Sequence, residues 1–236
     1  MEIKTSYITI PNSITGIIDS GYFISKFKDN SILKDMNKDI KIILVNENIN
    51  DYNLTVSEYI KFKIFSKHNT FKGYEKKLND SLKLIGFSDE YKNRKLSGLS
   101  YSELKYIAII NSLIDNPDVL VLENFFIGLD ISNIKKVFKI LKKIVDKYKK
   151  NVIIFTNDVD FIYKYIEDIV VFSGEDILLK GKTSDILENS WEVLINNKIS
   201  VPSSIEFINK VRKNKNIKLN YNKDIRDLIK DIYKKV

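Results

Sequence analysis

The sequence predicts an α/β protein whose mostly parallel sheet is covered by helices. Short β-branched apolar runs recur along the chain as far as Leu179, and longer stretches of helical period separate them. The runs are apolar throughout instead of alternating with polar residues, which is typical of strands buried on both faces. A content of 44% hydrophobic and 30% charged residues is typical of a globular protein. Together these observations indicate an α/β core.

The strands and helices alternate in order along the chain. The predicted strands are Ile14–Ile18, Ile40–Val45, Val119–Leu122, Val152–Thr156 and Ile169–Phe172, with Ile177–Leu179 pairing across a turn at Ser173-Gly174. The predicted helical patterns are Leu82–Ile85, Ser102–Leu113, Ile131–Tyr148 and Phe161–Tyr165. The block Thr55–Phe87 contains no strand pattern and is predicted to be a mostly helical insertion.

The domain organisation follows from where the strand pattern stops. Residues 1–187 are predicted to form the main domain, with a helical subdomain at about 55–115. Residues 188–236 hold no strand pattern but two amphipathic stretches, Ser203–Lys213 and Lys223–Lys234. They are predicted to form a small C-terminal helical appendage.

Composition excludes several classes of function. The chain has no cysteine and one histidine, which excludes disulfides, thiolate chemistry and metal sites rich in Cys or His. The net charge of +8 is spread as lysines with acids among them, which favours a solvated surface over nucleic-acid binding. No apolar run is long enough to span a membrane, and the first residues lack the apolar core of a signal peptide. We therefore expect a cytoplasmic chain.

An ordered series of motifs lies in the middle of the chain. Leu99–Glu103 opens a helical stretch, Asn116-Pro117 ends the next loop, the apolar run Val119–Leu122 follows, and Gly128–Asp130 comes after it. This order resembles the ATP-binding-cassette (ABC) ATPases, in which an LSGGQ signature, an N-P pair, a strand ending in D-E and G-L-D follow one another. The spacing from Leu99 to Asn116 and from Glu123 to Asp130 is that of the family.

Further matches extend the resemblance to about residues 14–187. Ile153–Asp158 stands where the family has a strand ending in T-H-D, and Asp168–Phe172 and Gly181–Thr183 resemble the usual end of the cassette. Leu54–Glu58 resembles the L-T-V-x-E that follows the glutamine loop. The resemblance implies a P-loop NTPase-like core with a helical signature subdomain.

The tail resembles one branch of the family. Ile199–Ser203, followed by Phe207, Val211 and a second helical stretch, is similar to the small C-terminal domain of energy-coupling-factor (ECF) transporter ATPases. The glutamine and glycine of that branch are absent here, so a generic two-helix cap is the alternative.

The phosphate loop departs from its pattern, G-x-x-x-x-G-K-[ST]. After the strand Ile14–Ile18, Asp19 replaces the first glycine, Ile24 the second and Ser25 the lysine, whereas Lys26 comes one position late. A β-branched Ile24 does not take the backbone angles available to glycine. A register shift that brings Lys26 into the site is the alternative. The implied remnants of a nucleotide site are Asp19, Gly21, Ser25, Lys26, Asn46, Ser100, Glu103 and Asp130.

The residues that the resemblance assigns to hydrolysis are also replaced. Glu123 stands in place of the aspartate that holds magnesium, and it remains a candidate Mg²⁺ ligand. Asn124 replaces the glutamate that orients the attacking water, and Asn157 replaces the switch histidine. Asn46 falls where the glutamine loop belongs and is a shorter amide. No catalytic residue is therefore expected to be intact.

The signature keeps its serine but changes its neighbours. Ser100 is retained, Tyr101 and Ser102 replace two glycines, and Glu103 replaces glutamine. A glutamate here would face the γ-phosphate of a nucleotide on the partner, which is an unfavourable like-charge contact. Ser100 acts on that phosphate only if Glu103 turns away.

These features together predict a degenerate ABC ATPase subunit, most similar to those of ECF-type vitamin or metal-ion importers. The expected role is the non-hydrolysing structural half of a heterodimer with an active sister ATPase, with ATP and Mg²⁺ held mainly at the sister's site. A transmembrane T (permease) subunit is expected to dock near Asn46–Lys61, which places the chain at the inner face of the membrane. One alternative is a non-transport regulatory protein built on a cassette without ATPase activity. The other is a working but unconventional ATPase. The sequence does not indicate the cargo.

Overall fold

The computed structural model describes most of the chain, which divides into two compact units. The first unit comprises 1–2, 11–13 and 37–153, and the second comprises 3–10, 14–36 and 154–236. Within these units the structure describes residues 3–4, 9–10, 13–19, 40–47, 49, 53–68, 73–174 and 176–235.

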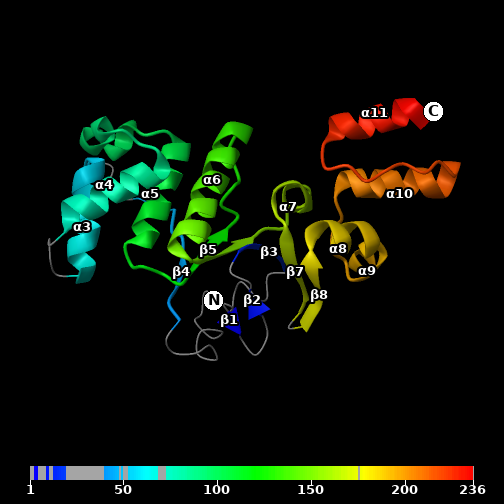
Figure 1. Cartoon of the computed structure of the whole chain (residues 1–236), viewed down its shortest axis with the longest axis horizontal. Helices are drawn as coiled ribbons and strands as arrows, with labels where there is room; N and C mark the ends of the chain where they lie inside the picture. The colour runs from blue at the N-terminus through cyan, green and yellow to red at the C-terminus, as the bar shows by residue number, and fades with distance from the viewer. Residues whose placement is uncertain are drawn as a thin grey trace. The chain divides into compact units, whose positions relative to one another are not determined.

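The first unit joins short parallel strands to most of the long helices (Figure 1). Its strands are β4 (Ile42–Leu44), β5 (Val119–Glu123) and the start of β6 (Asn151–Phe155). Its helices are α3 (Val56–His68), α4 (Tyr74–Ile85), α5 (Tyr101–Leu113) and α6 (Ile131–Tyr148), with short 3-10 turns η1 (Asp89–Asn93) and η2 (Leu96–Gly98). β4 pairs in parallel with β5, Ile42 opposite Val119.

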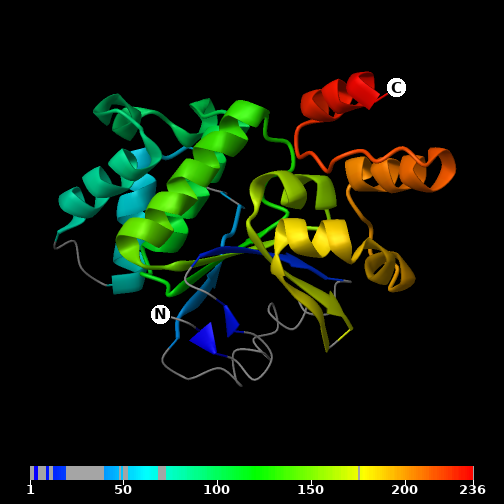
Figure 2. The same ribbon diagram turned by 45° about the vertical axis from the view of Figure 1, so that its right-hand side comes forward.

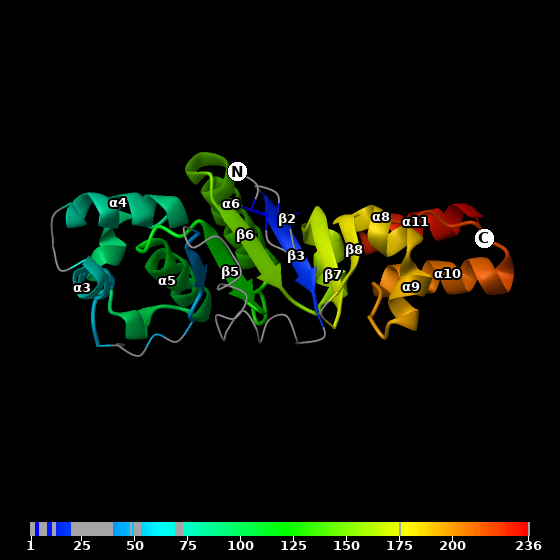
Figure 3. The same ribbon diagram turned by 90° about the horizontal axis from the view of Figure 1, so that it is seen from below.

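The second unit contains the remaining strands and the C-terminal helices. β3 (Ile14–Ile18) pairs in parallel with β7 (Asp168–Ser173), and β7 turns at Gly174 into the antiparallel β8 (Asp176–Lys182). Figure 3 shows these three strands side by side. A separate antiparallel pair is formed by β1 (Ile3–Lys4) and β2 (Thr9–Ile10). The helices are α7 (Val159–Tyr165), α8 (Thr183–Asn189), α9 (Trp191–Asn196), α10 (Ser203–Lys215) and α11 (Ile225–Lys235).

The strands confirm the predicted α/β class. The six-stranded sheet has the order β4-β5-β6-β3-β7-β8, and the division between the two units passes through β6. Residues 119–122 are fully buried, as expected for a strand of a parallel sheet with both faces covered. The predicted hairpin across Ser173-Gly174 is present, with β8 longer than its apolar run indicated.

The predicted helical block is confirmed by α3 and α4, and local hydrogen bonds explain where its first helix begins. The Thr55 N–H donates to the Glu58 carboxylate at 2.8 Å, and the Glu58 N–H donates to the Thr55 hydroxyl at 3.2 Å. This reciprocal pair is a capping box, which satisfies N–H groups that have no partner inside the helix. α3, α4, η1, η2 and α5 all lie within the predicted subdomain at about 55–115.

The tail forms the two predicted helices, which lie next to each other in Figure 2. They enclose a small apolar cluster of Ile208, Leu219 and Leu228. The Arg212 guanidinium fastens their connection by donating to the Leu219 carbonyl at 2.6 Å and to the Tyr221 hydroxyl at 2.7 Å. α8 and α9 were not predicted, because helices of 7 and 6 residues are too short to show a clear period. The predicted domain boundary after residue 187 stays a prediction.

None of the helices within the described ranges combines the length and the apolar character that crossing a membrane needs.

Candidate functional site

The N-terminus of α5 carries the predicted signature and is closed by its own side chains. Ser100 is the N-cap residue, and its hydroxyl accepts the Glu103 N–H at 3.3 Å. The Glu103 carboxylate bends back and accepts the Ser100 N–H at 2.7 Å. In this capping box the Ser100 hydroxyl is engaged in a hydrogen bond to its own helix.

Two further residues hold the Glu103 carboxylate. The Tyr91 hydroxyl donates to it at 2.8 Å, and the Arg94 guanidinium donates to it at 3.2 Å. Burial alone would raise the pKa of Glu103, but the hydrogen bonds from Ser100 and Tyr91 and the charge of Arg94 lower it overall. The sequence predicted that the Glu103 carboxylate would repel a phosphate on the partner, which requires the carboxylate to point away from its own helix. In the structure this carboxylate is instead turned toward its own helix and is paired with Arg94.

The loop after β5 contains the predicted hydrolysis residues Glu123 and Asn124. Glu123 is half-buried at the end of the strand, and Asn124 is exposed with a left-handed φ of 48°. Asparagine tolerates this conformation better than most residues, and it turns the chain out of the strand. Among the described residues no group of three Asp, Glu or His side chains forms a metal site. Glu123 as a magnesium ligand stays a prediction.

The residues after Asn124 fill the loop with aromatic rings. Phe125 and Phe126 are 1% and 8% exposed, and their rings meet edge to face with centroids 5.9 Å apart. Phe126 also stacks on Phe138 of α6 at 5.0 Å. Ile127 beside them is 66% exposed. The loop is therefore anchored by apolar packing.

Lys105 of α5 is a buried cation that is not among the predicted site residues. Its side chain is 2% exposed, and its ammonium group lies 2.9 Å from the Glu47 carboxylate. The same group donates to the Phe125 carbonyl and lies over the Phe125 and Tyr101 rings, 4.7 and 4.9 Å from their centroids. Lys105 thus joins α5 to the loop after β5 and to the segment after β4.

A signal for Lys105 was present in the sequence. It is a charged residue directly before the apolar run Tyr106–Ile110, and these five residues are at most 3% exposed. A lysine next to such a run is seldom buried without a partner. The sequence did not indicate the partner, because Glu47 lies far away along the chain.

The N-terminus of α6 carries the predicted Asp130. Its carboxylate accepts the Asn133 N–H at 2.8 Å and the Asn133 side-chain amide at 2.8 Å. The backbone hydrogen bond from Asn133 is the main reason why the pKa of Asp130 is lowered. Asn133 in turn accepts the Tyr106 hydroxyl at 2.6 Å, which ties α6 to α5. The structure therefore connects the Asp130 end of α6 to the signature helix.

The second unit holds two other predicted residues. Asp19 is buried directly after β3. Asn157 is exposed between β6 and α7, where Asp158 caps α7 by accepting the Phe161 N–H at 2.9 Å. Gly21, Ser25 and Lys26, and with them most of the predicted phosphate loop, lie outside the described residues.

The predicted site residues thus divide between the two units. Asn46, Ser100, Glu103, Glu123, Asn124 and Asp130 belong to the first unit, and Asp19 and Asn157 belong to the second. Within the first unit, Lys105 and the Tyr106–Asn133 hydrogen bond link the segments that carry them.

Comparison with curated proteins identifies relatives, although no protein-family model matches the chain. The chain is 28% identical over 189 residues to the energy-coupling factor transporter ATP-binding protein EcfA2 of Mycoplasmopsis synoviae. The match covers 80% of this chain but only 59% of that relative's length. The chain is also 24% identical over 199 residues to a putative ABC transporter ATP-binding protein of Clostridium acetobutylicum. This match covers 82% of this chain and 71% of that relative.

Solved structures show the same fold. The cbiO1 protein of Clostridium perfringens, part of the ABC transporter complex cbiONQ, matches with a TM-score of 0.63 and 20% identity over 91% of this chain and 86% of that one. The ADP conformation of the ATP-binding cassette MJ1267 matches with a TM-score of 0.65 and 18% identity over 83% and 98% of the two chains. The chain therefore has the α/β fold of ABC ATPase cassettes, and its sequence is similar to those of ABC transporter ATP-binding proteins.

Proposed function

We propose that this chain is a non-hydrolysing ATP-binding-cassette subunit of an ABC transporter, of the ECF type, and acts as the structural half of a heterodimer. The similarity to an energy-coupling factor ATP-binding protein supports the transporter class. The cassette fold, shared with a protein that is part of a transporter complex, agrees with it.

The chemistry at the ends of two strands carries the proposal. Asn124 follows β5, and Asn157 follows β6. Deprotonating the attacking water needs a base such as a carboxylate, and a histidine switch needs a group that gains and loses a proton. Both asparagines are uncharged amides at all ordinary pH values. The chain therefore keeps the cassette core without the groups that hydrolysis requires.

A sister ATPase is proposed to contact the face around Ser100 and Asp130. Three apolar residues that are near Ser100 or Asp130 in the sequence have exposed side chains: Tyr101 by 55%, Ile127 by 66% and Ile131 by 60%. Exposed apolar groups of this size favour a protein contact. The capping box uses the N–H groups of Ser100 and Glu103, which leaves those of Tyr101 and Ser102 at the start of α5 to favour an anion. Ser100 would thereby approach the γ-phosphate held mainly by the sister's phosphate loop.

A membrane T subunit is proposed to dock at the segment Asn46–Lys61. Asn46 and Lys61 are exposed, and the next residues on α3, Phe62 and Phe65, are 55% and 40% exposed. Two exposed aromatic rings on one helix suit an apolar helix of a partner. This contact would hold the chain at the inner face of the membrane.

The proposal is tested on the assembled complex. The chain is co-expressed with tagged products of neighbouring genes for an intact cassette and a multi-span membrane protein, and the complex is purified. We expect Ser100→Arg to suppress ATP hydrolysis by the complex at least about tenfold. Ser88→Arg is the matched control, because Ser88 is exposed and its side chain makes no cap hydrogen bond.

The isolated chain provides the second test. Calorimetric titration with Mg-ATP is expected to give weak or no binding, and phosphate release is expected to be absent. Micromolar affinity together with turnover that Asn124→Ala abolishes would establish a working ATPase instead. Failure to form any complex with a cassette or a membrane protein would remove the transporter role and favour the regulatory alternative.

A further inference from the structure

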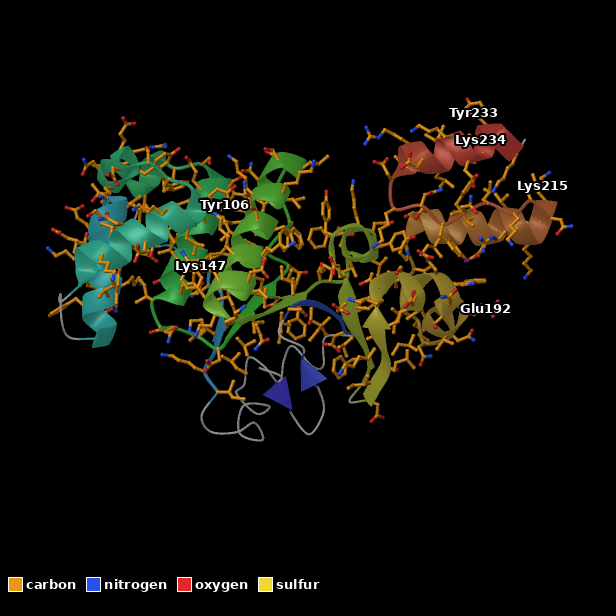
Figure 4. The ribbon with its side chains drawn as sticks, viewed as in Figure 1. Tyr106, Lys147, Glu192, Lys215, Tyr233 and Lys234 are labelled. Atoms are coloured by element: carbon orange, nitrogen blue, oxygen red, sulfur yellow. The ribbon has the colours of Figure 1, made fainter. Side chains whose placement is uncertain are left out.

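A cavity of about 430 Å³ lies in the first unit, between the end of α4, η1, α5 and α6. Its volume falls within the range of sites that take small organic molecules. Figure 4 labels Tyr106, which lines the cavity from α5, and Lys147, which belongs to the last turn of α6 and does not line it.

One wall of the cavity is strongly basic. Lys136, Lys139 and Lys143 line it from α6, and their spacing of three and four residues places them on one face of the helix. All three are exposed. Three like charges beside one cavity create a positive potential that attracts an anion.

The acidic residue in the cavity does not cancel this potential. Glu103 lines the cavity, but its carboxylate already accepts hydrogen bonds from the Ser100 N–H and the Tyr91 hydroxyl, and it pairs with Arg94. Its charge is therefore matched inside the chain. The charge of Lys136 also acts on the Asp130 carboxylate, which does not line the cavity.

The wall facing the lysines is aromatic and apolar. The Phe87 and Tyr91 rings stack with centroids 3.9 Å apart, and Tyr106 meets Phe87 edge to face at 6.0 Å. The Tyr106 hydroxyl is fixed by its hydrogen bond to Asn133. Because the Arg94 guanidinium lies over the Tyr91 ring, 4.7 Å from its centroid, Phe87 and Tyr106 are the rings that offer a rigid apolar surface to a planar group.

We propose that this cavity binds an organic anion that combines an aromatic ring with a phosphate-type dianion. The dianion would lie against Lys136, Lys139 and Lys143, and the ring would lie against Phe87 and Tyr106. A dianion matches three ammonium groups better than a monocarboxylate does, because the attraction scales with the charge. The proposal does not rest on the transporter role, since the cavity lies within one unit of the isolated chain.

The test measures binding of 1-naphthyl phosphate to the full chain by calorimetry at low salt. Inorganic phosphate, 1-naphthoate and 1-naphthol serve as the charge-only, monoanion and neutral probes. We expect 1-naphthyl phosphate to bind more tightly than all three and to weaken as salt is added. The triple variant Lys136→Gln, Lys139→Gln, Lys143→Gln is expected to bind it at least about tenfold more weakly.

A charge-matched control separates the cavity from the general basic surface. Lys135→Gln, Lys142→Gln and Lys147→Gln together remove three exposed charges from the same helix, none of which lines the cavity. This control is expected to bind 1-naphthyl phosphate as wild type does. If circular dichroism shows that either triple variant does not fold, two single variants provide the same comparison. Lys139→Gln then replaces the cavity variant, and Lys142→Gln replaces the control.

Three results would overturn the proposal. The first is no measurable binding of 1-naphthyl phosphate, and the second is equal weakening in the cavity variant and the control. The third is binding of 1-naphthol as tight as that of 1-naphthyl phosphate, which would make the cavity merely apolar.

Discussion

The signature end of α5 and the loop after β5 lie on connected segments of the first unit but are held by opposite means. At the signature, Ser100, Glu103, Tyr91 and Arg94 form a hydrogen-bonded polar network. After β5, the rings of Phe125 and Phe126 are buried. The first region pairs its charges within the chain, whereas the second is held by apolar packing.

The difference predicts which of the two regions rearranges at the lower cost. A polar network near the surface rearranges at modest cost, because water can replace its hydrogen bonds. A buried aromatic loop does not open without exposing apolar area. Lys105 stands between the two kinds of region, since its buried ammonium group is paired with Glu47 and the Phe125 carbonyl. Four predictions test this contrast, from the largest expected effect to the smallest.

Phe125→Ala should have the largest effect on stability. Phe125 is 1% exposed, so its removal leaves a cavity and should lower the free energy of unfolding by about 4 kcal/mol. Urea denaturation followed by circular dichroism measures the loss. The control is Ile127→Ala, which truncates a neighbour that is 66% exposed and should change stability little. Equal losses in the two variants would mean that the loop is not anchored by Phe125.

Lys105→Met should have the second largest effect. Methionine fills a similar volume, but Glu47 loses its partner and the Phe125 carbonyl loses its donor. Because Glu47 is 32% exposed and partly solvated, we expect a loss of about 2 kcal/mol instead of the full penalty for breaking a buried pair. Lys142→Met is the control on an exposed lysine. A Lys105→Met chain as stable as wild type would show that the ammonium group is dispensable there.

Glu103→Gln should cost less than either change. The amide keeps the shape of the side chain but weakens three charge-assisted hydrogen bonds, from Ser100, Tyr91 and Arg94. We expect a loss of about 1 kcal/mol in the free energy of unfolding. Glu90→Gln, at an exposed position of η1, provides the comparison. A loss above that of Phe125→Ala would reverse the contrast between the two regions.

The smallest expected effect is a dependence on pH. The pKa of Glu103 in the folded chain lies below its ordinary value of 4.5, so its stabilisation is present above that pH. The contribution is lost as the pH falls through the folded-state pKa, because the unfolded chain then binds the extra proton first. The stability difference between wild type and Glu103→Gln should therefore shrink below about pH 4.5. Urea midpoints from pH 7 to pH 3 measure it, and a constant difference would contradict the assignment.

Much of the fold could be predicted because most of its strands and long helices show their period within a short stretch of sequence. Each predicted strand from β3 to β7 is a short apolar run, and Ile131–Tyr148 shows its helical period over 18 residues. The short helices α8 and α9 were missed, because one or two turns give no clear period. The left-handed backbone of Asn124 was missed as well, since the turn after β5 depends on packing around it.

The candidate site was predictable only as a set of residue identities. Motif order alone placed Ser100, Glu123, Asn124 and Asp130, and their assigned roles remain predictions. The direction of the Glu103 carboxylate was not predictable, because Tyr91 and Arg94 come from a separate turn of the chain. From the sequence, the three cavity lysines belong to a solvated lysine-rich surface. Only the structure shows that they line a cavity together with the end of α4 and Tyr91.

The sequence by itself determined the strands and the long period of α6, and it predicted that the catalytic residues are replaced, because these inferences depend on residue type and on spacing along the chain. Only the tertiary structure decided that Lys105 is buried against Glu47, that Glu103 is paired within its own chain and that a basic cavity lies beside α6. The reason is physical: burial and charge pairing depend on which distant segments meet, and a residue's own sequence neighbours do not specify its partner.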